Sequence, residues 1–119
     1  MRVTSHNVDD ALVLRVVGRI ELGSASQLHD AIAASLALPA PGPIVIDLGG
    51  VTFLGSVGLA MLTKLATEAT RSGRPLRIVV AANPLVSMPL ELSGLEDELA
   101  LYPSVQAALD DPWPDPTQP

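Results

Sequence analysis

Hydrophobic residues along the chain follow two spacings, one typical of strands and one typical of helices. The strand-like stretches are aliphatic runs, the first weakly alternating, at 2–8, 11–17, 44–47 and 76–82. Helical repeats at three- and four-residue steps lie at 27–38, where we expect Leu28 and Ile32 to face the sheet, and from Val57 to Arg71. The pattern predicts an antiparallel hairpin followed by a parallel strand-helix-strand unit with a right-handed crossover.

Glycine, proline and small polar residues separate these elements. We expect Gly18 to end the second strand, and a short loop to lead into a helix capped by Ser24 or Ser26. The stretch from Pro39 to Pro43 ends that helix, and Gly73 takes the usual glycine position after the next one. These breaks are too short to be linkers between domains, so we expect one domain.

The last third of the chain carries shorter elements. Residues 83–84 are an asparagine cap followed by a proline suited to the first helical position, so a helix is expected to begin there. Pro89 lies inside that helix at a cost of roughly 3 kcal/mol, which predicts a single turn or a kink. A short edge strand over 99–102 and a final helix over 103–109 follow. The acidic, proline-rich residues 111–119 are expected to be disordered.

One junction combines a strand end, a serine and a helix start. Gly55-Ser56-Val57-Gly58 stands between the strand that begins at Ile44 and the next helix. A serine at this place suits the N-cap, since its hydroxyl can accept hydrogen bonds from the unpaired amides of the first turn. The helix dipole and the same amides also favour negative charge, so a phosphate on Ser56 would be stabilised. Ser56 is therefore either a cap alone or a cap that also serves as a switch.

The residues around this serine resemble a family signature. Residues 47–59 read Asp-Leu-x-x-Val-x-Phe-Leu-Gly-Ser-x-Gly-Leu, which resembles the signature of STAS domains, the family of bacterial anti-sigma factor antagonists and of the cytosolic tails of sulfate transporters. The family signature ends Asp-Ser-Ser-Gly-Leu or Asp-Ser-Ala-Gly-Leu, and its first serine is phosphorylated in the antagonists. Residues 14–21 (LRVVGRIE) and 92–95 (LSGL) are similar to the family's Gly-Glu-Leu-Asp and Ser-Gly-Leu turns. The resemblance covers residues 3–110.

The resemblance implies a fold, a function and a set of contact residues. The fold would be a STAS-like α/β domain over residues 1–110, with a mixed central sheet of four to five strands and helices mainly on one face. The function would be that of a non-enzymatic anti-sigma factor antagonist, which binds a kinase-like anti-sigma factor and so frees a sigma factor. The protein would be a monomer or weak dimer, and phosphorylation of Ser56 would switch its binding off. The residues expected to contact the partner are Phe53, Leu54, Gly55, Ser56, Val57, Gly58, Met61 and Glu21.

The chain departs from the family signature on both sides of the serine. Gly55 stands where the family has its aspartate, and Val57 where the family has a small residue. Loss of the carboxylate predicts either a poorer kinase substrate or a constitutively competent binder, while the acceptor hydroxyl is retained. Two other functions remain open: a STAS subunit of a lipid or anion transport complex, docking through the same face without phosphorylation, and a small ligand-binding α/β domain.

Length and charge narrow the classes of partner. The 119 residues suffice for one domain. The net charge of −6 argues against a nucleic-acid partner or an anionic membrane, because phosphate binding needs a basic face. No stretch reaches the ~18 apolar residues needed to span a bilayer, and residues 1–10 lack the apolar run of a signal peptide. We therefore expect a cytoplasmic protein without membrane insertion.

Catalytic and metal-binding motifs are incomplete. The hydrolase elbow Gly-x-Ser-x-Gly has Leu54 in place of its first glycine, and both histidines, His6 and His29, precede Ser56 although the base of that fold follows its serine. The Gly-x-x-x-x-Gly spacing at 50–55 leads into a serine where a phosphate-binding loop requires lysine. The chain has no cysteine, which removes thiolate catalysis and cysteine metal sites. We expect no enzymatic activity, no cofactor and no metal.

Overall fold

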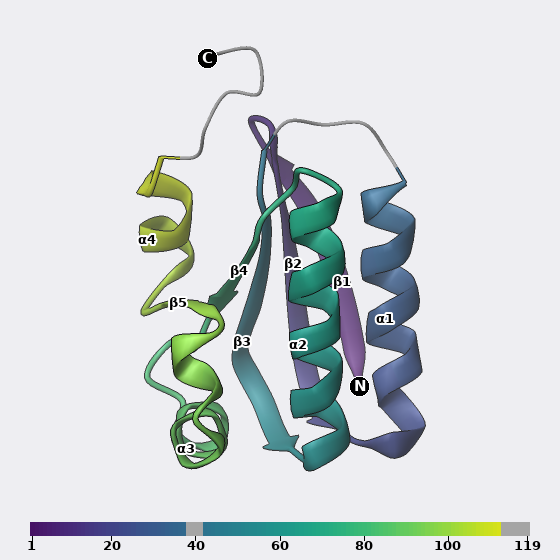
Figure 1. Cartoon of the computed structure of the whole chain (residues 1–119), viewed down its shortest axis with the longest axis vertical. Coiled ribbons are helices and arrows are strands. Elements are labelled where there is room, and N and C mark those ends of the chain that lie inside the picture. Colours follow the sequence, from purple (N-terminus) through teal and green to yellow (C-terminus); the bar gives the residue numbers. More distant parts are fainter. Residues whose placement is uncertain (38–41, 113–119) are drawn as a thin grey trace.

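The computed structural model describes residues 1–37 and 42–112. Its elements are β1 (Arg2–Val8), β2 (Ala11–Ile20), α1 (Leu22–Leu36), β3 (Ile44–Leu54), α2 (Ser56–Arg71), β4 (Leu76–Val79), α3 (Pro84–Ser93), the 3-10 turn η1 (Leu95–Asp97), β5 (Ala100–Tyr102) and α4 (Val105–Asp110). The strands form one five-stranded sheet in the order β1-β2-β3-β4-β5 (Figure 1). β1 pairs antiparallel with β2, and the other neighbours pair parallel. The predicted hairpin, parallel unit and mixed sheet are confirmed.

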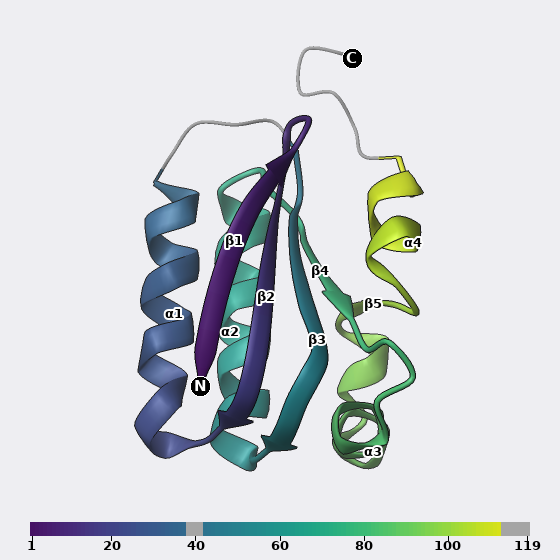
Figure 2. The ribbon, with the colours of Figure 1, turned by 180° about the vertical axis from the view of Figure 1, so that it is seen from behind.

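Each face of the sheet carries its own apolar cluster. Alternate residues of β2 and β3, such as Leu14 and Ile46, point into the larger cluster, where they meet Leu28 and Ile32 of α1 and buried residues of α2 and α3. The smaller cluster, on the opposite face beneath α4, joins Val13, Val45, Val79 and Ala108. Because strand side chains alternate between faces, neighbouring residues of one strand serve different clusters. The helices therefore lie mainly on one face, as predicted, and α4 covers part of the other (Figure 2).

The turn from β2 into α1 differs from the sequence prediction. Gly18 does not end β2, which continues to Ile20 through a shift of its register against β3. Its φ of 107° is open to glycine at no steric cost, so the residue forms a bulge instead of a break. Neither predicted serine caps α1: Glu21 is the N-cap, and Ser24 lies inside the first turn, where its Oγ accepts a hydrogen bond from the Glu21 N–H at 3.1 Å.

The helix after β4 begins as predicted but extends further. Asn83 caps α3, its side-chain oxygen accepting from the Leu85 N–H at 3.1 Å, and Pro84 follows at the first helical position. The helix continues through Pro89 to Ser93 and does not stop after one turn. Val86 and Leu90 of this helix are fully buried. Burying each such side chain contributes about 1.5–3 kcal/mol, which offsets the roughly 3 kcal/mol cost of an interior proline.

Two predicted segments fall partly outside the described residues. Residues 38–41 hold most of the proline-rich stretch before β3, and residues 113–119 hold most of the predicted tail. The described start of that tail is bound to the sheet. Arg77 of β4 donates hydrogen bonds to the carbonyl oxygens of Ala108 (2.7 Å), Pro112 (3.1 Å) and Asp111. Arg77 therefore fastens α4 and the two residues after it to the sheet.

Candidate functional site

The residues highlighted by the sequence gather where β2 and β3 end. Parallel strands bring their carboxyl ends to one edge of a sheet, and the turns into α1 and α2 follow at that edge (Figure 1). The Gly55 N–H donates a hydrogen bond to the Ile20 carbonyl oxygen at 3.2 Å. This bond ties the turn before α2 to the end of β2, so Ser56 and the Glu21 turn lie on the same end of the molecule.

Ser56 is the first residue of α2, and the prediction that it caps the helix is wrong. Gly55 is the N-cap, with φ −88° and ψ 176°, and its carbonyl oxygen accepts the first helical hydrogen bond, from the Leu59 N–H at 3.0 Å. The Ser56 side chain is exposed and forms no hydrogen bond with any described residue. It still stands beside the unpaired N–H groups of the first turn. The position therefore favours a negatively charged group on the hydroxyl.

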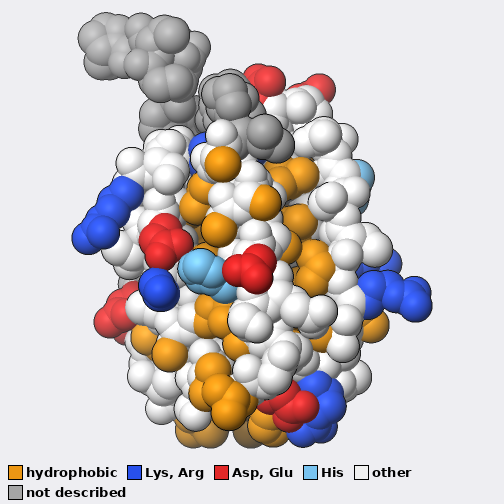
Figure 3. All heavy atoms as spheres, turned by 90° about the vertical axis from the view of Figure 1, so that its right-hand side faces the viewer, with side chains coloured by type: hydrophobic (Ala, Val, Ile, Leu, Met, Phe, Trp, Pro, Cys, Tyr) orange, Lys and Arg blue, Asp and Glu red, His pale blue; other side chains and the backbone are white. Residues whose placement is uncertain are grey.

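Exposed apolar side chains border this serine. Leu22 is 79 % exposed, Val57 42 % and Phe53 40 %. Leu22 and Val57 also line a groove between α1 and α2, to which Met61 contributes at half exposure. Figure 3 shows apolar side chains gathered at the lower end of this side of the molecule. A group of exposed apolar side chains with a polar border is typical of a surface that contacts another protein.

Two of the predicted contact residues lie in the interior. Leu54 is buried in the larger apolar cluster, and Gly58 is buried in the first turn of α2. A Cβ atom at position 58 would lie 2.8 Å from side-chain carbons of both Ile20 and Leu54. Glycine therefore allows α2 to approach the end of β2 this closely. Leu54 and Gly58 hold Ser56 in place and present no side chain to a partner.

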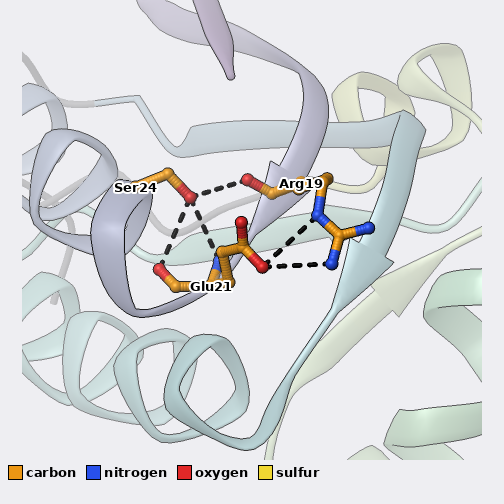
Figure 4. Close-up of polar contacts among 3 residues, drawn as sticks. All are labelled: Arg19, Glu21 and Ser24. Carbon is orange, nitrogen blue, oxygen red and sulfur yellow. Dashed lines mark hydrogen bonds and ion pairs between the residues drawn. The ribbon is translucent and has the colours of Figure 1, made fainter.

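The sequence reasoning missed Arg19, which organises the polar side of the site. Its guanidinium lies over the Phe53 ring, with Cζ 4.4 Å from the ring centroid. The same guanidinium donates hydrogen bonds to the Glu21 carboxylate at 3.1 and 3.3 Å (Figure 4). Ser24 Oγ donates to the Arg19 carbonyl oxygen at 2.6 Å. The sequence signal that could have indicated this ion pair is the two-residue spacing of the opposite charges of Arg19 and Glu21, just after the aliphatic run 11–17. A partner would therefore meet an ion pair here instead of a free Glu21 carboxylate.

The two histidines of the chain lie on different elements. His6 is exposed on β1, and His29 of α1 has its Nε2 3.7 Å from the Glu68 carboxylate of α2. Within residues 1–37 and 42–112, no group of three or more acidic or histidine side chains is placed to hold a metal ion. No helix in the described part of the chain is long and apolar enough to cross a bilayer.

Comparisons with known proteins agree on one family. The family model described as "Mlab, STAS domain" matches residues 3–103. RsfB of Mycobacterium tuberculosis, named an anti-sigma-F factor antagonist, is 36% identical over 108 residues, covering 90% of this chain and 84% of RsfB. RsfA of Mycobacterium tuberculosis, also named an anti-sigma-F factor antagonist, is 27% identical over 110 residues, covering 92% of this chain and 85% of RsfA. The crystal structure of an anti-sigma factor antagonist from Mycobacterium paratuberculosis superposes with a TM-score of 0.81 at 33% identity, covering 91% of this chain and 90% of that one.

Proposed function

The chain belongs to the STAS domain family, and we propose that it acts as an anti-sigma factor antagonist, which binds an anti-sigma factor and so frees a sigma factor. The observation that carries the proposal is the exposed Ser56 hydroxyl at the first position of α2, bordered by exposed apolar side chains. The protein would work by binding alone, as a monomer or weak dimer in the cytoplasm. No chemistry by its own side chains is required.

The proposed docking surface consists of the exposed residues around the serine. Phe53, Val57 and Met61 supply apolar contact area, and Gly55 leaves the serine uncovered. Glu21 contributes through its ion pair with Arg19 at the border of the surface. Exposed ion pairs contribute little affinity, typically below about 1 kcal/mol, so the apolar side chains should dominate binding. The partner would be a kinase-like anti-sigma factor.

Phosphorylation of Ser56 is the proposed off switch. Transfer of a phosphoryl group to the Ser56 Oγ adds about −1.5 to −2 charges to a surface that otherwise binds its partner mainly through apolar contacts. A single like charge of the partner at ~5 Å, at an effective dielectric constant near 20, would oppose binding by about 3 kcal/mol, roughly a hundredfold in affinity. The unpaired amides of the first turn of α2 would stabilise the phosphate where it stands, so the switch needs no refolding.

Gly55 decides how readily that switch operates. Its φ of −88° and ψ of 176° are open to any residue, so the backbone does not require glycine here. A Cβ atom would lie 3.0 Å from Cε1 of the Phe53 ring, which would have to shift slightly. Without a carboxylate beside the acceptor hydroxyl, we expect slow phosphorylation and a protein that stays competent to bind.

A matched pull-down tests the proposed function. The unmodified chain and its Ser56→Glu variant serve as baits in a lysate of the source cells, and bound proteins are identified by mass spectrometry. We expect a kinase-like anti-sigma factor with the unmodified bait and much less of it with the variant. Recovery of a membrane transport complex by both baits would contradict the proposal and support a STAS transport subunit.

A further inference from the structure

The face of the sheet opposite α1 and α2 is covered over only part of its area. α4 packs on this face near the hairpin that joins β1 and β2, and none of the helices among the described residues covers β1, β2 and β3 toward their other end (Figure 2). The strand register places the exposed side chains of Arg2, Arg15, Val17, Arg19 and Phe53 on this uncovered half, and we call these residues the arginine face.

Charged and apolar side chains alternate across the arginine face. Arg2 of β1 lies directly opposite Val17 of β2, and Arg15 is one diagonal step away, a separation of about 7–8 Å between such positions. Arg19 pairs in register with Phe53 of β3 and stacks on its ring. Two guanidinium groups therefore flank Val17, and a third lies beside Phe53.

This face holds most of the exposed positive charge of an acidic protein. The chain has seven Lys and Arg residues and a net charge of −6. Arg74 and Arg77 are buried and donate hydrogen bonds to backbone carbonyl oxygens, which leaves five exposed cations. Three of the five lie on the arginine face, and Figure 3 shows basic side chains on its right-hand side, where this face is seen in profile.

The two acids on the same face offset part of its positive charge. Asp47 is the register partner of Arg15 but forms no ion pair with it, and its Oδ1 accepts a hydrogen bond from the Gly49 N–H at 2.9 Å. Glu21 is bound to Arg19. The side chains of Arg2 and Arg15 form no hydrogen bond or ion pair with any residue in the described part of the chain. Their guanidinium groups are therefore available to an external carboxylate.

We propose that the arginine face docks an acidic segment of a protein partner, with carboxylates opposite Arg2 and Arg15 and apolar side chains on Val17 and Phe53. Guanidinium groups bind carboxylates through paired N–H donors, and this geometry suits a planar acidic group. The apolar positions Val17 and Phe53 between and beside the arginines favour a peptide, which also has apolar side chains, over a polyphosphate chain. The inference requires neither Ser56 nor an anti-sigma factor.

A titration of the full chain tests this surface. The probe is a short synthetic peptide of alternating glutamate and leucine, added to the ¹⁵N-labelled protein and followed by NMR. Amide shifts should be confined to the strand ends that carry the arginine face. Arg15→Gln should weaken binding about threefold, and the added Arg2→Gln should bring the loss to roughly tenfold.

The control separates local contact from overall charge. Arg71→Gln removes the same charge from an exposed position on α2, and it should leave the affinity unchanged. An equal loss in Arg71→Gln and Arg15→Gln, or shifts spread over the whole molecule, would overturn the proposal. Tighter binding of single-stranded DNA or of anionic lipid vesicles than of the peptide would also overturn it, in favour of a different class of ligand.

Discussion

Replacement of Gly58 by alanine tests how closely α2 must approach the end of β2. The added Cβ would lie 2.8 Å from Ile20 Cγ2 and from Leu54 Cδ1, and 3.3 Å from the Ile20 carbonyl oxygen. Carbon atoms in contact prefer about 3.5–4.0 Å, so the neighbours must move by most of an ångström. Ile20 is fully buried and Leu54 nearly so, which leaves them little room.

Two opposing effects set the magnitude of this change. Overpacking of a core typically costs about 1–3 kcal/mol, whereas alanine in place of a helical glycine returns up to about 1 kcal/mol. Gly23 is the matched control, because it also lies in the first turn of a helix and an added Cβ would meet nothing within 4 Å. The helical gain is common to both variants, so we expect Gly58→Ala to be about 1–3 kcal/mol less stable than Gly23→Ala.

Urea unfolding followed by circular dichroism measures this difference directly. Both variants should retain the helical spectrum and unfold with the same slope, since neither changes the area exposed on unfolding. The unfolding midpoint should fall for Gly58→Ala and hold or rise for Gly23→Ala. Equal midpoints for the two variants would refute the claim that close packing at Gly58 positions the start of α2.

The other predictions concern the hydrogen bonds of Arg77 to the C-terminal segment, the pKa of Tyr102 and the residue before Ser56. Arg77→Met should destabilise the fold by about 2–3 kcal/mol, because it removes hydrogen bonds from a buried guanidinium to carbonyl oxygens, and hydrogen exchange should increase in α4 before α1. Burial, and secondly the hydrogen bond to Asp111, raise the pKa of Tyr102 above its usual 10.0. The contribution of this tyrosine to stability is therefore complete below about pH 10 and is lost as the pH rises through the raised pKa. Tyr102→Phe should remove this pH dependence from the urea unfolding midpoints. Gly55→Asp should fold normally, since aspartate is a good N-cap, and should increase the phosphoserine that mass spectrometry detects after incubation with the cognate kinase and ATP. An unchanged yield would contradict the role assigned to the missing carboxylate.

Local sequence patterns predicted most of the elements and the position of Ser56 between a strand and a helix. The aliphatic runs of β2, β3 and β4 and the buried stripe of Leu28 and Ile32 are set by periodicity within single segments. The placement of Ser56 at an exposed strand-to-helix turn followed from the same reasoning. Such features depend on residues that are close together in the sequence, and the spacing of apolar and polar residues records this local information.

Features that depend on distant residues were missed. The residue that caps α2 depends on where the chain leaves β3. The hydrogen bond from the Gly55 N–H to the Ile20 carbonyl oxygen sets this place, and it makes Gly55 the N-cap instead of Ser56. The role of Arg19 requires Phe53 on the adjacent strand, a pairing that exists only after the parallel sheet has formed. The sequence left open whether the helix stops after one turn or continues past Pro89, and the burial of Val86 and Leu90 accounts for its continuation. Tertiary contacts overrode local propensity in each case.

The affinity of Ser56 variants for the anti-sigma factor tests the central claim most directly. Ser56→Ala removes the hydroxyl without adding charge, and Ser56→Glu places a carboxylate at the first position of α2, where the helix dipole tolerates it and the fold should stay intact. Isothermal titration calorimetry should give unchanged binding for the alanine variant and binding at least about tenfold weaker for the glutamate variant. Equal affinities for the two variants would contradict control at this hydroxyl.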